Sequence, residues 1–111
     1  MKKLLLSLAI LMFTVSAAFA GPSVKDAYVN AYIITATTTT VKTGAGILHT
    51  ITVEGGTAGT ITVYDNTAAS GTKLADFSST NAIQTYIFDV TFSTGLTIVT
   101  SAATSVSVSY K

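Results

Sequence analysis

Very few side chains in this sequence have the types needed for chemistry. His49 is the one histidine, cysteine is absent, and five acidic residues stand singly along the chain. A catalytic triad needs a nucleophile and an acid beside its histidine, and a zinc site needs further soft ligands. His49 falls on the same predicted strand face as Ile47, Ile51 and Val53. We therefore interpret it as a residue at a strand end or partly buried under a loop.

The acidic residues also lack the spacing of a catalytic or metal site. Glycoside hydrolysis needs two carboxylates across a cleft, but Asp65, Asp76 and Asp89 fall at predicted strand ends or on outward faces. Asp65-Asn66 offers oxygen ligands for calcium without the regular spacing of a calcium loop, and the same residues are typical of a turn. We predict that the protein is not an enzyme and has no catalytic, cofactor-binding or metal-binding residues.

Charge excludes one class of partner. The sequence contains no arginine, and residues 21–111 carry four lysines and five acids, a net charge of −1. Proteins that bind nucleic acid grip its phosphates with arginine and lysine, so we predict no nucleic-acid partner. Charged residues make up only 10% of the chain, and such side chains normally keep monomers apart. A surface coated by serine and threonine hydroxyls favours lateral contact with protein.

The first 20 residues have the pattern of a signal peptide. A cationic start is followed by an apolar run from Leu4 to Val15, and Ala18-Phe19-Ala20 supplies the small residues recognised by signal peptidase. The apolar run is at the short end of the roughly 20 residues that span a bilayer. We therefore favour cleavage before Gly21 over a retained membrane anchor.

This pattern sets the predicted organisation of the chain. Residues 1–20 form a signal helix, and residues 21–111 form one domain with no membrane association after cleavage. The predicted location is exported: periplasmic, extracellular or on a virion surface.

Period-two alternation runs through most of residues 21–111 and is typical of half-buried strands. The clearest local pattern is a predicted hairpin of residues 47–54 and 60–65, joined by a glycine-rich turn. In its first strand Leu48 falls on the face opposite His49, Ile51 and Val53.

Three further strands have marked patterns. Residues 27–34 are apolar on both faces, so we expect cover on both sides, and the aromatic-rich residues 86–92 should lie at the centre of the core. Residues 105–110 alternate serines with Val106, Val108 and Tyr110, which we expect to point inward. The predicted fold is all-β: a single antiparallel β-sandwich or small jelly roll of about seven to eight strands.

Several segments also resemble a known group of proteins, in the same order along the chain. They are VKTGAGILHTITV at 41–53, GTITVYDN at 59–66, ASGTKL at 69–74, FSTGLTIV at 92–99 and VSVSYK at 106–111. Through them residues 35–111 resemble small head-decoration or tail-associated β-sandwich proteins of tailed bacteriophages. The resemblance implies a virion-surface or assembly role in repeated copies, and brings no catalytic residues. The signal peptide departs from it, because virion proteins normally assemble in the cytoplasm, and this leaves room for an exported relative.

These observations favour a non-enzymatic structural or assembly module, phage-virion-like or an exported relative of such a protein. Its expected partners are copies of itself or other structural proteins, and we take Thr52, Thr62 and Tyr64 as candidate surface contacts. The alternative is a secreted adhesion or carbohydrate-binding domain with a glycan ligand, since the loops of a sandwich often bind ligands.

Overall fold

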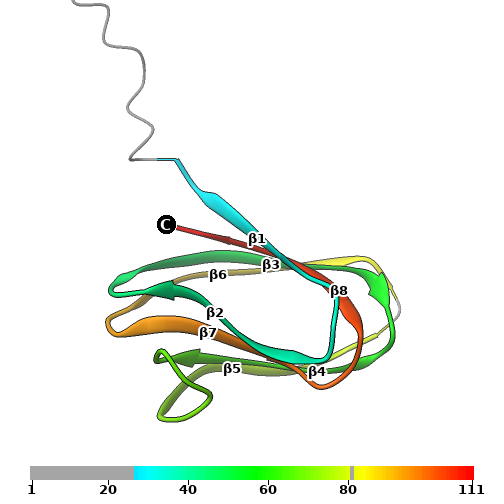
Figure 1. Ribbon diagram of the computed structural model, residues 1–111. Helices are drawn as coiled ribbons and strands as arrows, with labels where there is room; N and C mark the ends of the chain where they lie inside the picture. The colour runs from blue at the N-terminus through cyan, green and yellow to red at the C-terminus, as the bar shows by residue number, and fades with distance from the viewer. Residues whose placement is uncertain (1–26, 81) are drawn as a thin grey trace, which may run out of the picture.

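Eight strands make up the described part of the chain, residues 27–80 and 82–111 of a computed structural model (Figure 1). Their bounds are β1 Val29–Ile33, β2 Thr37–Thr43, β3 Gly46–Gly56, β4 Gly59–Asp65, β5 Thr72–Ser79, β6 Gln84–Phe92, β7 Gly95–Thr100 and β8 Thr104–Tyr110. The predicted signal helix and its cleavage site lie outside the described residues. Within them, no helix is long and apolar enough to cross a membrane.

The strands form two antiparallel sheets of four strands each. Sheet A has the order β1-β8-β3-β6, and sheet B has the order β2-β7-β4-β5. The prediction of an all-β fold of about seven to eight antiparallel strands is therefore confirmed. In chain order, β4 and β5 are the one consecutive pair among these eight strands that are neighbours in a sheet, so most connections pass from one sheet to the other.

The predicted hairpin of residues 47–54 and 60–65 is wrong for this reason. β3 belongs to sheet A and β4 to sheet B, so the two strands do not pair. Gly55 and Gly56 end β3 at φ values of 124° and 83°, and the chain crosses to sheet B through Thr57 and Ala58. Glycine adopts positive φ without steric cost. Two alternating segments joined by glycines are therefore compatible with a connection between two sheets as well as with a hairpin.

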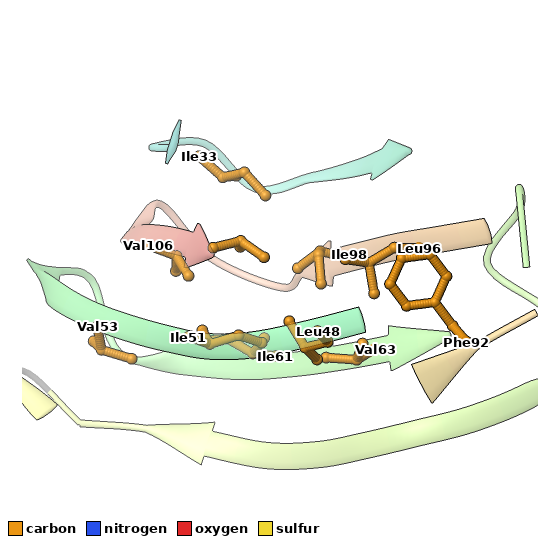
Figure 2. Close-up of a cluster of buried hydrophobic side chains, with 11 residues drawn as sticks. Ile33, Leu48, Ile51, Val53, Ile61, Val63, Phe92, Leu96, Ile98 and Val106 are labelled. Carbon is orange, nitrogen blue, oxygen red and sulfur yellow. The ribbon is translucent and has the colours of Figure 1, made fainter. Parts of the chain in front are cut away.

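The core lies between the two sheets and receives alternate side chains from both (Figure 2). Strand alternation sends every second residue inward, and many of these residues are β-branched and suit an extended backbone. Burying one such side chain fully contributes about 1.5–3 kcal/mol. The buried apolar residues are Ile33, Leu48, Ile51, Val53, Ile61, Val63, Phe92, Leu96, Ile98, Val106 and Val108.

A β-bulge in β3 overturns the predicted faces of that strand. Between Leu48 and Thr50 the β3–β8 register advances two residues on β3 for one on β8, so His49 is the extra residue. A bulge of this kind shifts the alternation by one position. Leu48, Ile51 and Val53 are all buried, and the prediction that His49 shares the face of Ile51 and Val53, opposite Leu48, was wrong.

Two further predictions concern the edges of sheet A. The inner face of β6 is aromatic as expected, with Phe92 buried and Tyr86 and Phe88 packed against the core, but β6 is an edge strand rather than the centre. β1 is the other edge, and its outward Tyr32 is 61% exposed, so the expected cover on both sides was also wrong. The inward valines of β8 are buried as predicted.

Candidate binding surface on sheet A

The outer face of sheet A is assembled by strand register. Residues that pair across β1, β8, β3 and β6 form rows on the side of the sheet opposite the core. One row contains Tyr32, Ser107, Thr52 and Thr85, and the next contains Asn30, Ser109, Thr50 and Ile87. We call these eight residues the hydroxyl face.

The hydroxyl face has an uncharged centre and an apolar residue at each edge. The serines and threonines of its central strands are half-buried, and the Thr52 and Thr85 hydroxyls lie 3.0 Å apart in a hydrogen bond. Tyr32 is 61% exposed on β1 and Ile87 is 71% exposed on β6. Because no member of either row carries a charge, nothing within the rows opposes close approach of another protein.

A polar cluster lies beyond one end of these rows, where β3 bulges. His49 Nδ1 is hydrogen-bonded to the Asp89 carboxylate, and the Tyr28 ring stacks on the imidazole with centroids 4.5 Å apart. The Lys111 ammonium lies 5.3 Å from the centre of the Tyr28 ring, within cation–π range. Asp89 has a φ of 48°, a conformation that costs strain in most residues but that Asp tolerates better than most.

The contacts of the His49 ring are made by few side chains. The Nδ1–H group of His49 donates a hydrogen bond to the Asp89 carboxylate. The second ring nitrogen, Nε2, is the other polar atom of the imidazole. In the described residues Asp89 is the one side chain hydrogen-bonded to His49. The same residues contain no group of three or more acids and histidines that could hold a metal ion.

Sequence analysis missed the pairing of His49 with Asp89, which are separated by 40 residues. Each residue alone has an ordinary strand context. Only the register of β3 against β6, with its irregularity between Leu48 and Thr50, brings them together. The available signal was a single histidine at the point where the alternation of inward and outward residues in β3 shifts by one position. That shift can be recognised only when the buried residues of the strand are known.

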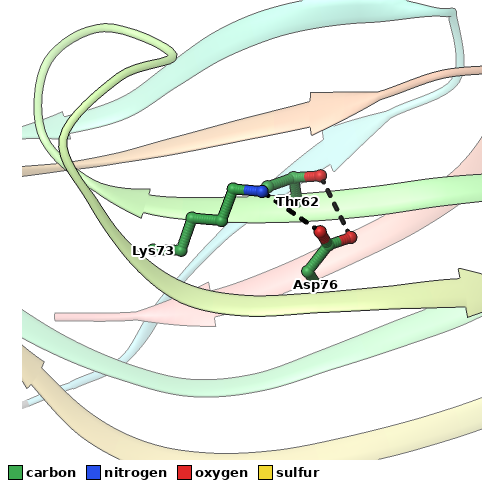
Figure 3. Close-up of polar contacts among 3 residues, drawn as sticks. All are labelled: Thr62, Lys73 and Asp76. Carbon is green, nitrogen blue, oxygen red and sulfur yellow. Dashed lines mark hydrogen bonds and ion pairs between the residues drawn. The ribbon is translucent and has the colours of Figure 1, made fainter.

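Thr52, Thr62 and Tyr64 do not form one surface. Thr52 is on the outer face of sheet A, whereas Thr62 and Tyr64 alternate with buried residues of β4 on the outer face of sheet B. Thr62 donates a hydrogen bond to Asp76 at 3.4 Å, and Lys73 forms an ion pair with the same carboxylate at 3.3 Å. Figure 3 shows the three side chains together. The Tyr64 side chain, expected to be an exposed contact, is only partly exposed.

The Asp65 carboxylate holds the turn at residues 93–95. Its carboxylate accepts hydrogen bonds from the backbone N–H groups of Ser93 at 3.0 Å, Thr94 at 2.8 Å and Gly95 at 3.4 Å. The Ser93 N–H, followed by that of Thr94, stabilises the carboxylate and holds the pKa of Asp65 below 3.8, its ordinary value. The Asn66 amide donates to the Ser70 carbonyl oxygen at 2.9 Å, as expected for a turn.

The loop that follows Asp65 covers part of sheet B. Thr97 points away from the core, yet it is fully buried, because the loop covers it. The Thr97 hydroxyl donates a hydrogen bond to the Asn66 carbonyl oxygen in this loop, at 2.7 Å. Thr40 donates to the Thr67 carbonyl oxygen at 3.0 Å. The outer face of sheet B is therefore partly occupied by the protein's own chain.

Comparison with protein family models, curated proteins and solved structures finds no match to this chain.

Proposed function

We propose that this chain is a non-enzymatic structural or assembly module that associates with copies of itself or with other structural proteins. The observation that carries the proposal is the hydroxyl face: two uncharged rows with exposed Tyr32 and Ile87 at their edges. Surfaces of soluble monomers are normally dense in charged side chains. Two adjoining rows without them, across all four strands of a sheet, suit contact with protein.

The strand order supports a more specific class. The first, eighth, third and sixth strands share one sheet, and the second, seventh, fourth and fifth share the other. This is the order expected of an eight-stranded jelly roll, an architecture used by viral capsid proteins and lectins. We therefore propose a jelly roll that acts in a virion-like setting, as a capsid-decoration or tail-associated protein or as an exported relative.

Light scattering tests this proposal. The sample is the protein recovered after expression of the full-length sequence. We expect the mass to rise above that of one chain across a concentration series. Thr52→Lys puts a charge at the centre of the hydroxyl face and should prevent the larger assemblies. Thr62→Lys makes the same change on sheet B and should leave them intact. A wild-type chain that stays monomeric throughout would contradict self-association.

A carbohydrate-binding or adhesion domain is the second candidate. It is favoured by the cluster of Tyr28, His49 and Asp89, which places an aromatic ring beside polar groups on an exposed surface. A glycan array probed with the wild-type chain and with Asp89→Ala tests it. Glycan binding that the substitution abolishes would favour this candidate over a purely structural role.

Export is also part of the proposal, and it rests on the N-terminal sequence pattern. Expression of the full chain should give a protein that lacks residues 1–20 and begins at Gly21. Intact-mass measurement of the protein outside the cytoplasm checks this. A protein of unprocessed mass in the cytoplasmic fraction would contradict export and would favour a virion protein that assembles in the cytoplasm.

A further inference from the structure

The four edge strands of the two sheets are not equally protected against pairing with other strands. β2 has a register irregularity between Thr40 and Lys42, and the β4–β5 ladder has one between Val63 and Tyr64. β6 contains Asp89 at positive φ. Such irregularities twist an edge and oppose edge-to-edge association. β1 is different, because its register with β8 is unbroken.

β1 is also the most apolar exposed segment in the described residues. Four of the six large apolar side chains exposed there belong to β1 or to the residues that adjoin it: Tyr28 at 43%, Val29 at 53%, Tyr32 at 61% and Ile34 at 55%. No charged residue occurs between Ala27 and Val41. A sheet edge presents unpaired backbone N–H and C=O groups, and the group that matches all of them is another strand.

We propose that β1 pairs antiparallel with β1 of a second copy, about a twofold axis at Ala31. The inference rests on the proposed function. It specifies that the partner is a second copy of the chain and that β1 makes the first contact in self-association. In this register Val29 lies opposite Ile33 of the second copy, and Asn30 lies opposite Tyr32. Tyr28 and Ile34, which flank the strand, are likewise opposed.

The sequence of β1 is complementary to itself in this register. Every pair joins two residues of the same face, because the positions of each pair are both odd or both even. The pairs at Val29 and Ile33 are β-branched, and cross-strand pairs of this type stabilise antiparallel ladders. Ala31 is the smallest side chain of β1 and would occupy the crowded position on the axis. All four exposed apolar residues of the segment gain a partner.

The dimer explains how the hydroxyl face becomes a larger surface. With the twofold axis perpendicular to the sheet, two copies of sheet A join into one continuous sheet with both hydroxyl faces on the same side. The rows that contain Tyr32 and Asn30 then continue into the second copy. Contacts through this doubled face follow dimer formation as a separate step.

Charge exchange tests the register directly. Asn30→Lys combined with Tyr32→Lys places lysines opposite one another in both symmetric pairs and should weaken dimerisation about tenfold or more. Ile83→Lys is the matched control, since it also replaces an exposed apolar residue, next to edge strand β6 of sheet A, and Ile83 is not part of the hydroxyl face. Mixing the lysine variant with Asn30→Asp and Tyr32→Asp should restore dimers that contain one copy of each.

A cross-link provides the second test. Paired Cα atoms of antiparallel strands lie about 4.5–5.5 Å apart, within the span of a disulfide. Because the chain has no cysteine of its own, oxidised Ala31→Cys should give a covalent dimer, and Tyr32→Cys and Thr85→Cys should give little. Circular dichroism establishes that each variant folds.

The outcomes separate this inference from the proposed function. Covalent dimers of Ala31→Cys with restored pairing of the charge variants support the β1 dimer. A wild-type oligomer that persists in the lysine variant, or an equal cross-link yield from Tyr32→Cys, overturns the β1 dimer and leaves self-association standing. A wild-type chain that is monomeric at every concentration overturns self-association itself.

Discussion

The carboxylate of Asp65 accepts a 2.8 Å hydrogen bond from the backbone N–H of Thr94, 29 residues further along the chain. Asp65 ends β4 in sheet B, and Thr94 lies in the turn by which the chain passes from β6 in sheet A to β7 in sheet B. The Ser93 N–H and hydroxyl bind the same carboxylate. One side chain therefore holds a crossing between the two sheets.

Asp65→Ala should lower the melting temperature, because it leaves the N–H groups of Ser93 and Thr94 without their acceptor. Asp76→Ala is the matched control. Asp76 also contacts a neighbouring strand, but its partners are the exposed Lys73 and Thr62 side chains, and exposed ion pairs contribute little. Thermal unfolding followed by circular dichroism compares the two, and equal losses would contradict the role assigned to Asp65.

The lowered pKa of Asp65 predicts a pH dependence of stability. A carboxylate whose pKa is lower in the folded than in the unfolded chain stabilises the fold fully only above the unfolded value. The contribution is lost as the pH falls from about the ordinary value of 3.8 through the lower folded value. Urea unfolding at a series of pH values should show this loss in the wild type and a shallower one in Asp65→Ala. Parallel curves for the two proteins would contradict it.

Leu48→Ala tests the bulge in β3. Leu48 is fully buried, so its truncation should cost about 2–5 kcal/mol of unfolding free energy. Ile47 is only partly buried, and Ile47→Ala should cost distinctly less. Simple alternation predicts the reverse order, so chemical denaturation of the two variants decides between the two arrangements of this strand.

Thr97→Val removes a buried hydroxyl while keeping the shape of the side chain. The Asn66 carbonyl oxygen loses its hydrogen bond, which should cost about 1–2 kcal/mol, and the loop over sheet B should be cleaved more readily by protease. Thr62→Val serves as the control, because the hydrogen bond of Thr62 to Asp76 is long and exposed. Unchanged stability and proteolysis in Thr97→Val would show that the loop is held by other contacts.

The sequence predicted which residues form strands, and alternation in β8 correctly indicated its inward valines. What it did not predict was which strands are neighbours. Period-two alternation tells the face of a residue and carries no information about its partner strand. For that reason Thr52 and Thr62, expected in one hairpin, lie on different sheets.

The cluster at His49 escaped prediction for a related reason. The bulge that turns His49 outward depends on the register of β3 against β8 and β6, and no local sequence pattern defines that register. Asp89 has no special context of its own in the sequence. The sequence supplied the residue types of the surface, whereas the order of the strands determined which of them meet.

The position of β8 between β1 and β3 has a consequence for synthesis. β8 is the one strand hydrogen-bonded to β1 within sheet A, and it also pairs with β3. A chain emerging from the ribosome in N-to-C order therefore leaves β1 unpaired within its own sheet until its last strand is available. Pairings this distant in sequence form slowly, and sheet A cannot be completed before β8 has been synthesised.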